Sequence, residues 1–399
     1  MKRSNALPKA GIFLDCDPGG GGSYQYALSV LKALSRSEGF ELTAFFSNDL
    51  WAPVCSGMGI AGYKITENKL LDIICKILRR LPLPFGLYRK LNTLFSSVGR
   101  IMKVNKIDFC VYPSQASQSY NYDIKAICAI HDLMHKYKSE FPEVASEITG
   151  RDRHFNKLCR WSSAILVDSN MGRQHVIESY PVDEQKIYVL PFIAPDYIYD
   201  KPDNFNSAVL LKQYNLPSKY FFYPAQFWLH KNHQNLIKAL YALKQSIPDI
   251  KMVFVGTQKN ANHMIQTLID ECDLNSNIIT LGYVTNDEMT ALYKNARALI
   301  MPTFFGPTNI PQLEAFELGC PVATSGIFGI PEQVGDAALL FDPYSVEEIK
   351  ECMEKLWMDD TLCEGLAKKG RKHAQQWGQK QFADKLSEIL HAVFTGQKV

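Results

Sequence analysis

The residues best suited to chemistry lie in one stretch, residues 303–335. Pro, Gly and Asn crowd its first half, so the backbone turns there, and the following pattern predicts a helix that begins near Pro311 and ends at Gly319. Backbone amides at such a loop-to-helix junction point outward without partners, and the helix dipole favours an anion beside them. Glu314 is expected in the first turn, where a carboxylate can accept hydrogen bonds from sugar hydroxyls. Together these groups would suit a nucleotide sugar, and the same pattern also fits an ordinary strand-loop-helix connection of an α/β protein.

The same stretch resembles the donor-site signature of retaining glycosyltransferases with the GT-B fold, the family-four group. That signature has two glutamates separated by seven residues, and the second matches Glu314 at the start of the run EAFELGCPV. The position of the first glutamate, which in the family faces the hydroxyls of the donor sugar, holds Gly306. The resemblance implies donor contacts from the residues around the predicted helix start, and Asn309 or Thr308 could replace the missing carboxylate. The expected donor-binding residues here are Thr308, Asn309, Ile310 and Pro311.

Length and composition limit the class of protein. A chain of 399 residues is long for a single core and fits two domains of ordinary size. A net charge of +2 gives no reason to expect a nucleic-acid partner, and the ten scattered cysteines show no spacing typical of zinc. No apolar run approaches the ~18 residues of a membrane span, and the first one is too short and acidic for a signal peptide. We therefore expect a cytoplasmic protein with reduced thiols.

The first part of the chain predicts half of a doubly wound sheet. Residues 11–17 predict a strand, which is followed by a glycine-rich loop, an amphipathic helix and a second strand. Three glycines of this loop, Gly20, Gly21 and Gly22, would let the backbone approach a ligand closely, and the family has a comparable loop facing its cleft. A dinucleotide-binding motif would need a glycine at position 24, which holds Tyr24, so the sequence gives little support for NAD. A flexible turn without a ligand is the alternative.

His131 lies at the carboxyl end of a predicted strand, which is the edge where open α/β sheets bind ligands. The run from His131 to Pro142 resembles a family segment whose histidine faces the donor sugar and the reaction centre. A histidine there could hydrogen-bond a sugar hydroxyl or carry a proton, or it could be purely structural. The neighbouring His135 and His154 are expected at the surface. Farther on, Ser169 is expected to cap a helix.

Lys231 lies just before a helix expected to start near Asn232, after a Pro-rich linker at residues 191–205. An ammonium group beside a helix N-terminus can neutralise a diphosphate leaving group. In the family an Arg and a Lys share this role, and Lys231 matches the Lys while the Arg position holds Gln226. Diphosphate binding is then expected to depend more on Lys231 and on loop amides near Asn309 and Ile310. The alternative is that Lys231 is merely exposed.

Two further turns complete the expected donor site. A strand is expected to end in a loop at Gly256, and the family holds the nucleotide base through the backbone of a turn that corresponds here to Tyr283 and Val284. Thr285 and Glu288 fit a capping box that would start the next helix.

Residues 64–106 are basic and amphipathic, with ten Lys and Arg against Glu67 and Asp72. Helices of this composition can lie on an anionic membrane surface, and the family often uses lipid-linked acceptors. A pair of solvated helices covering the sheet is an equal alternative, and Pro82 and Pro84 are expected to break the segment into two pieces.

The resemblance covers most of the chain and implies an α/β protein of the GT-B type, with two Rossmann-like domains that face a cleft. Residues 1–195 would form the acceptor-side domain, residues 196–376 the donor domain, and a last helix from about 377 to 399 would cross back. The implied activity is transfer of a sugar with retention, from a nucleotide-diphosphate sugar, GDP-mannose first, to a lipid-linked cell-surface polysaccharide of the O-antigen or lipopolysaccharide kind. His131, Lys231 and Glu314 would be catalytic.

No metal or other cofactor is implied by the resemblance, and the protein would lie in the cytoplasm or at the inner face of the cytoplasmic membrane. The departures at Gly306 and Gln226 keep two alternatives open. One is a GT-B protein that binds a nucleotide sugar without turnover. The other is a nucleotide-sugar epimerase, which would release an altered sugar nucleotide without an acceptor.

Overall fold

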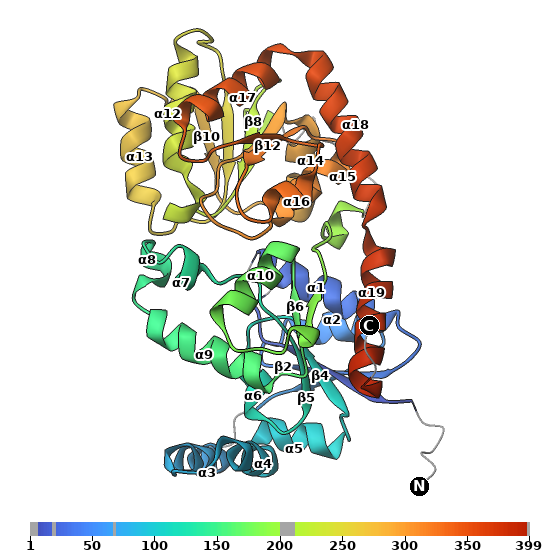
Figure 1. Ribbon diagram of the computed structural model, residues 1–399. Coiled ribbons are helices and arrows are strands. Elements are labelled where there is room, and N and C mark those ends of the chain that lie inside the picture. Colours follow the sequence, from blue (N-terminus) through green and yellow to red (C-terminus); the bar gives the residue numbers. More distant parts are fainter. Residues whose placement is uncertain (1–6, 18–20, 67–68, 200–211, 397–399) are drawn as a thin grey trace. The chain divides into compact units, whose positions relative to one another are not determined.

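The computed structural model describes residues 7–17, 21–66, 69–199 and 212–396, and Figure 1 shows them along the chain. These residues form two compact units. Unit 1 comprises Met1–Lys136, Glu147–Pro191 and Gln379–Val399, and unit 2 comprises Tyr137–Ser146 and Phe192–Gly378. The sequence predicts that the first domain ends at residue 195, and in the structure the boundary between the two units lies after Pro191. The short segment Tyr137–Ser146 groups with unit 2, although the sequence predicts it in the first domain.

Unit 1 is built on a seven-stranded parallel sheet with the order β3-β2-β1-β4-β5-β6-β7. Its central strands are short apolar runs that are buried on both faces, as expected for a parallel sheet covered by helices. The strands are β1 (Lys9–Leu14), β2 (Glu41–Phe46), β3 (Ala61–Lys64), β4 (Phe109–Tyr112), β5 (Lys125–Ala129), β6 (Ala164–Val167) and β7 (Ile187–Val189). The helices are α1 (Gly22–Ser35), α2 (Trp51–Gly57), α3 (Lys69–Arg80), α4 (Phe85–Phe95), α5 (Ser97–Val104), α6 (Gln118–Asn121), α7 (Met134–Tyr137), α9 (Ile148–Trp161), α10 (Asn170–Ser179), η1 (Glu184–Lys186) and α19 (Gln379–Thr395).

Unit 2 contains a six-stranded parallel sheet with the order β10-β9-β8-β11-β12-β13. The strands are β8 (Phe221–Pro224), β9 (Met252–Val255), β10 (Ile278–Leu281), β11 (Ala298–Met301), β12 (Val322–Ser325) and β13 (Leu339–Phe341). The helices are α8 (Pro142–Ala145), η2 (Asp196–Ile198), η3 (Leu229–Lys231), α12 (His233–Lys244), α13 (Asn262–Glu271), α14 (Asn286–Asn295), α15 (Ile310–Leu318), α16 (Ile330–Val334), α17 (Val346–Met358) and α18 (Asp360–Gln376). Its core is rich in aromatic side chains such as Phe222, Phe254 and Tyr293, which are fully buried.

Each sheet has one point where the direction of winding reverses, between β1 and β4 in unit 1 and between β8 and β11 in unit 2. Loops on the two sides of such a point diverge to opposite faces, so open α/β sheets bind ligands in the crevice at the carboxyl ends of these strands. The fold therefore fixes where a site should lie in each unit before any side chain is considered.

Several predictions of local structure are confirmed. Ser169 and Thr285 cap the helices that follow them, and Thr285 forms the predicted capping box with Glu288. The last helix, α19, belongs to unit 1, where Phe382 packs edge-on against Tyr26 of α1. All ten cysteines are free thiols.

Two expectations about local structure are wrong or incomplete. His135 is buried rather than exposed, because its Nε2 lies 2.9 Å from the hydroxyl of Tyr180 and its ring stacks on Phe155. The basic segment breaks at the prolines as expected, but it forms three helices, since Ser96 starts a new one by accepting from the Gly99 amide. Within the described ranges, no helix is both long enough and apolar enough to cross a lipid bilayer.

Candidate functional site

The two loops that meet at the reversal point of unit 2 are hydrogen-bonded to each other. The carbonyl oxygen of His230, after β8, accepts from the amide of Phe304 (2.8 Å) and from Oγ1 of Thr303 (3.2 Å), both after β11. Asn232 Nδ2 donates to Pro302 O at 2.8 Å. The loop with Lys231 and the loop that leads to Asn309 are thus fixed side by side at the carboxyl edge of one sheet.

Lys231 ends the short turn η3, and Asn232 caps α12 in the left-handed conformation, with φ 57°. The backbone of Lys231 is fixed because its carbonyl oxygen accepts from Tyr223 Oη at 2.7 Å. A cation at a helix N-terminus opposes the helix dipole, so this position is favourable only when an anion is bound beside it. Burial and the nearby charge of Lys231 lower the pKa of His233 to about 3, so this ring is neutral and adds no charge.

Gln226, which stands at the position of the family's arginine, has its side-chain oxygen 2.9 Å from Trp228 Nε1, which donates to it. The backbone of the same loop passes very close to Gly256 at the end of β9. A Cβ atom at position 256 would lie 2.3 Å from the carbonyl oxygen of Ala225, and the residue has a φ of 156°. Glycine at this predicted donor position is therefore already required by packing.

Replacing Gly256 with alanine should lower the free energy of unfolding by about 2 kcal/mol or more, because a backbone clash adds to an unfavourable φ. Thermal or urea unfolding measures this directly. Gly282→Ala is the matched control, since a Cβ there meets nothing within 4 Å, and its effect should stay within about 0.5 kcal/mol. Equal effects of the two changes would contradict the packing explanation.

Gly306 replaces the family's first glutamate in a loop that is shaped for glycine. Its φ is 140°, and a Cβ there would lie 2.8 Å from Oδ1 of Asn309. A glutamate would therefore be strained and would collide with Asn309, whose side chain occupies the space beside position 306. The backbone of this loop therefore suits glycine at position 306, and the change from glutamate involves more than the loss of a side chain.

Asn309 is the N-cap of α15, and its backbone is held by a residue that sequence reasoning missed. Gln333 of α16 accepts from the Asn309 amide (2.9 Å) and donates to its carbonyl oxygen (2.7 Å). The Asn309 amide is thus engaged by Gln333, and phosphate binding by the loop amides near Asn309 and Ile310 stays a prediction. The side-chain Nδ2 of Asn309 is buried and has no hydrogen-bond partner among the described residues, and the whole residue is 8% exposed.

Glu314 lies at the fifth position of α15, in its second turn, so the predicted place in the first turn is wrong. Pro311 is the second helical residue, not the first. Both carboxylate oxygens of Glu314 accept hydrogen bonds, Oε1 from Tyr197 (2.7 Å) and Oε2 from Tyr293 (2.6 Å). Burial raises the pKa of Glu314, and the two hydroxyls oppose this rise only in part. Each oxygen keeps a second acceptor position, so a role toward sugar hydroxyls stays a prediction.

The turn after β10 contains Tyr283 and Val284, for which contact with a nucleotide base stays a prediction. Tyr283 is 79% exposed, while Val284 is buried and anchors the turn in the core. Glu288 Oε2 accepts from the Thr285 amide at 2.7 Å, which fixes the start of α14 directly behind the turn.

In unit 1, His131 follows β5 and lies near the reversal point between β1 and β4. Its Nε2 is 2.9 Å from the carbonyl oxygen of Pro113, which can only accept, so Nε2 carries a proton. Burial lowers the pKa of His131, which favours the neutral ring with Nδ1 as an acceptor. The loops after β1 and β4 are joined because Ser114 Oγ donates to Asp15 Oδ1 at 2.6 Å.

The glycine-rich loop contributes to the same edge of unit 1. Gly21 has a φ of 63° and is the N-cap of α1, and Gly22 is the first residue of that helix. Gly20 lies outside the described residues.

A second missed residue is Glu143 of α8. Its Oε1 lies 3.2 Å from His230 Nδ1, beside Lys231 in the sequence, and the ring of Phe141 stacks on Phe304 at 5.8 Å. Burial alone would raise the pKa of Glu143, but the hydrogen bonds with His230 bring it down to about 2. The segment Tyr137–Ser146 is therefore attached to both loops that form the edge of unit 2. Nothing in the local sequence indicates this long-range pair.

Glu143 should make the protein sensitive to acid. Its pKa is lower in the folded state than the ordinary 4.5, so its contribution to stability is complete above about pH 4.5 and is lost as the pH falls toward 2. In Glu143→Gln this part of the pH dependence should disappear, and stability at pH 7 should fall by about 1–3 kcal/mol. Urea unfolding between pH 7 and pH 3 measures both effects. Identical pH slopes for the wild type and Glu143→Gln would contradict the assignment, and exposed Glu271→Gln is the control.

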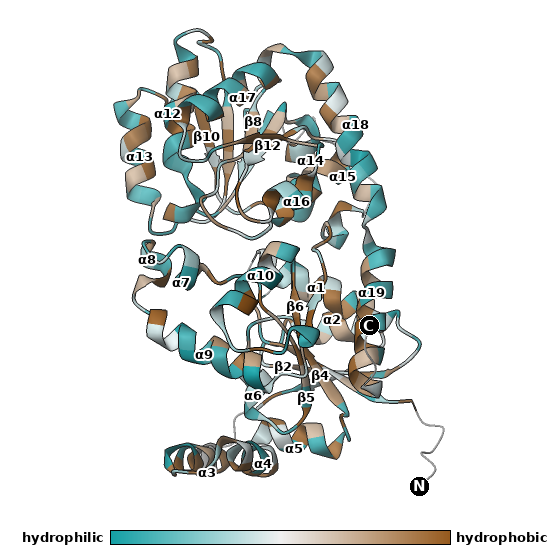
Figure 2. Cartoon of the chain, viewed as in Figure 1, coloured by the Kyte–Doolittle hydropathy of each residue, from teal (hydrophilic) through white to brown (hydrophobic). Residues whose placement is uncertain are grey.

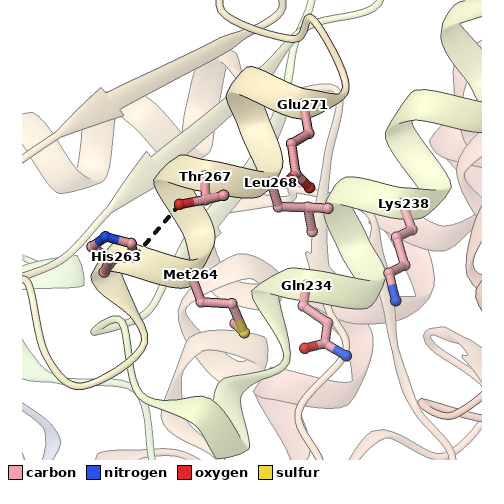
Figure 3. A pocket seen from close by; sticks show the side chains of 7 residues that line it. All are labelled: Gln234, Lys238, His263, Met264, Thr267, Leu268 and Glu271. Carbon is pink, nitrogen blue, oxygen red and sulfur yellow. Dashed lines mark hydrogen bonds between the residues drawn. The ribbon is translucent and has the colours of Figure 1, made fainter.

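Figure 3 shows a surface hollow between α12 and α13 that includes none of the predicted site residues. Its lining comes from side chains of these two helices, and Thr267 Oγ1 lies 3.5 Å from His263 Nδ1. The hollow is thus separate in sequence and position from the loops at the carboxyl edge of the sheet. Among the described side chains, no group of three or more His, Cys, Asp or Glu could hold a metal ion.

Comparison with known proteins finds similar sequences and a similar fold. Residues 211–373 match the family Glycosyl transferases group 1. The serotype-specific mannosyltransferase WbdA of Escherichia coli is 26% identical over 253 residues, which cover 61% of this chain and 30% of the relative. The O-antigen chain mannosyltransferase B of the same species is 28% identical over 217 residues, covering 53% of this chain and 56% of the relative. The chain thus spans less than two thirds of the length of either relative.

A solved structure of HepE from Anabaena, in complex with UDP and glucose, has a TM-score of 0.74 with 16% identity, and the alignment covers 96% of this chain and 100% of HepE. Two parallel-sheet α/β units with such neighbours define the GT-B class of folds. Within that class, residues 211–373 are similar to the glycosyl transferases of group 1, which supports the resemblance to the family-four type that the sequence indicates.

Proposed function

We propose that the protein is a retaining glycosyltransferase that moves a sugar from a nucleotide-diphosphate donor to a growing cell-surface polysaccharide. The observation that carries the proposal is the joining of two loops at the reversal point of unit 2. It fixes Lys231 beside the loop that opens α15. GDP-mannose is the first donor to test, because the curated relatives are mannosyltransferases. The acceptor would be an oligosaccharide carried on a lipid.

The groups at this edge suit the departure of a diphosphate. The ammonium of Lys231 and the N-terminus of α15 would balance the charge that develops on the leaving group, without a metal or other cofactor. The bond from the anomeric carbon to the diphosphate oxygen breaks, and a bond to an acceptor hydroxyl forms on the same face. The hydroxyl proton passes to the departing diphosphate. Tyr283 and Val284 would hold the base, and His131 and Glu314 would contact the sugar.

The site supports turnover better than binding alone. A decayed site would be expected to lose the first glutamate and leave a gap, but Gly306 lies in a conformation made for glycine. The position next to it is filled by Asn309, which Gln333 holds through two backbone hydrogen bonds. We infer that Asn309 Nδ2, buried without a partner among the described residues, donates to the donor sugar in place of the missing carboxylate contact.

Asn309→Ala should therefore reduce kcat/KM for the donor roughly tenfold or more, as expected for one lost hydrogen bond in a buried site. The fold should be nearly unaffected, because the Gln333 hydrogen bonds use the backbone of residue 309 and would remain. Initial rates at several donor concentrations give the measurement, and Asn295→Ala is a control on the far end of α14. Unchanged transfer by Asn309→Ala would exclude this role.

Transfer itself is tested by incubating the full chain with GDP-mannose, UDP-glucose and other nucleotide sugars together with a lipid-linked, mannose-ended acceptor. The proposal expects an elongated product whose new bond has the anomeric configuration of the donor. Release of a changed sugar nucleotide without an acceptor would instead identify an epimerase. Binding of a donor without any product from any acceptor would favour the protein that binds but does not turn over.

A further inference from the structure

The loop that follows β9 is attached to the loop that follows β8, and β9 neighbours β8 on the side opposite β11. We call residues 256–261 the β9 loop. The amide of Phe227 donates to the carbonyl oxygen of Thr257 at 3.1 Å, and the amide of Ala261 donates to the carbonyl oxygen of Phe227 at 2.9 Å. The β9 loop is therefore fixed against the same backbone segment that carries Lys231 a few residues farther on.

The β9 loop carries a lysine whose charge is not compensated. The ammonium of Lys259 lies over the ring of Trp228, with 5.3 Å between Nζ and the ring centroid. Lys259 is exposed, and among the residues that the structure describes its ammonium has no acidic partner and no hydrogen bond. Two lysines close by in the sequence differ in this respect, since Lys244 and Lys251 each donate to a backbone carbonyl oxygen.

Trp228 connects this ammonium to the loop after β8. Its Nε1 donates to Gln226 Oε1 at 2.9 Å, while its ring lies beneath the Lys259 ammonium. The backbone next to both residues is also held, because the amide of Leu229 donates to Asn260 Oδ1 at 3.2 Å. The Lys259 ammonium thus has a defined place at the carboxyl edge of the sheet of unit 2, beside the loop that contains Lys231.

Lys259 and Lys231 also share an electrostatic setting. Lys231 precedes α12, and Lys259 precedes α13, which begins at Asn262. A cation in front of a helix opposes the helix dipole, so both positions become favourable when an anion is bound beside them. Figure 2 shows a mainly hydrophobic sheet in unit 2, and β9 itself is apolar and fully buried, so the charged groups at this edge come from the loops.

We propose that Lys259, held on the ring of Trp228, is a second cation for the diphosphate of the donor and favours a nucleoside diphosphate over a nucleoside monophosphate. The inference rests on the proposed function, because it adds a residue to the same donor site. Gln226 is neutral and engaged with Trp228, so it supplies no charge at this edge. A lysine binds phosphate as a point charge on a flexible stem, and the aromatic face restricts that stem. Trp228 is then a positioning residue.

Titration calorimetry with the full chain tests the role of Lys259, using GDP with GMP and UDP with UMP. Lys259→Gln should weaken binding of the diphosphate about five- to tenfold and binding of the monophosphate less, because the diphosphate carries more charge. Its affinity should also depend less on salt. Lys259→Arg keeps the charge and should bind like the wild type. Lys368→Gln, on the exposed side of α18, is the matched control and should change neither affinity.

The positioning role of Trp228 is tested with two variants. Trp228→Phe keeps an aromatic face under the ammonium and should bind the diphosphate within about twofold of the wild type. Trp228→Leu removes that face and should weaken binding several-fold although Lys259 is still present. In the double variant Trp228→Leu/Lys259→Gln the two losses should not add, because one acts through the other. Losses that add fully would overturn the positioning role.

The results separate this inference from the proposed function. A wild type that binds neither GDP nor UDP would contradict both. Binding that Lys231→Ala weakens, but that Lys259→Gln leaves unchanged, would keep the donor site and overturn the role of Lys259. Equal weakening of diphosphate and monophosphate by Lys259→Gln would overturn the selectivity. The thermal midpoint of Lys259→Gln without nucleotide should equal that of the wild type, because the side chain is exposed.

Discussion

Lys231→Ala should lower kcat/KM for the sugar donor by about 10²–10³-fold, the effect of removing one preorganised charge from a leaving-group site. Lys231 is the cation that matches the family's phosphate-binding pair, and the arginine of that pair is replaced by Gln226, which is engaged with Trp228. With one of the two charges already absent, the remaining one should carry more of the stabilisation. The fold should not suffer, because the hydrogen bond from Tyr223 is to the backbone of residue 231.

The same change should slightly raise the stability of the free protein, by about 0.3–1 kcal/mol, since a cation at the N-terminus of α12 opposes the helix dipole. Lys238→Ala, on the exposed side of the same helix, is the matched control and should change neither activity nor donor affinity. Steady-state kinetics and thermal unfolding of the three proteins measure both effects. Donor kinetics of Lys231→Ala that equal those of the wild type would remove Lys231 from the site.

Glu314→Gln should reduce transfer about 10²-fold while lowering stability by only about 1 kcal/mol. The amide keeps the size of the carboxylate, and a tyrosine hydroxyl can turn to accept from it, so the contacts with Tyr197 and Tyr293 are largely preserved. What the amide loses is the negative charge and one acceptor. Activity that falls far more than stability would place Glu314 in the reaction rather than only in the fold.

The pH profile gives a second test of Glu314. Burial raises its pKa, so activity that depends on the carboxylate should rise with pH through a midpoint above the ordinary 4.5. Tyr197→Phe removes a hydroxyl that lowers this pKa, so the midpoint should move to higher pH in that variant. A midpoint that does not move, together with Glu314→Gln activity equal to that of the wild type, would mean that Glu314 only holds the Tyr197 and Tyr293 hydroxyls in place.

Elements that depend on local chemistry could be predicted from the sequence. The strands at residues 221–224 and 298–301 are apolar runs that end at Pro224 and just before Pro302. The helix starts at Ser169 and Thr285 follow from side chains that cap their own helix. The position of Lys231 before α12 followed in the same way. Local rules suffice here because each partner lies within a few residues.

The contacts that define the site could not be predicted in this way, because their partners are far apart in the chain. Tyr197 and Glu314 are 117 residues apart, and Glu143 and His230 are 87 apart. Gln333 accepts a hydrogen bond from the backbone amide of Asn309, and no sequence motif indicates this contact. The first-turn position of Glu314 was wrong because α15 starts one residue before Pro311, at Ile310.

Binding of a nucleotide sugar by this chain is tested most directly by thermal unfolding with a panel of GDP-, UDP-, dTDP- and ADP-sugars. One donor should stabilise the wild type, by about 2.7 kcal/mol at a hundredfold excess over its Kd, and should stabilise Lys231→Ala much less at the same concentration. That donor would name the nucleotide and locate it at the joined loops of unit 2. No stabilisation by any donor, or equal stabilisation of the wild type and Lys231→Ala, would contradict a donor site at Lys231.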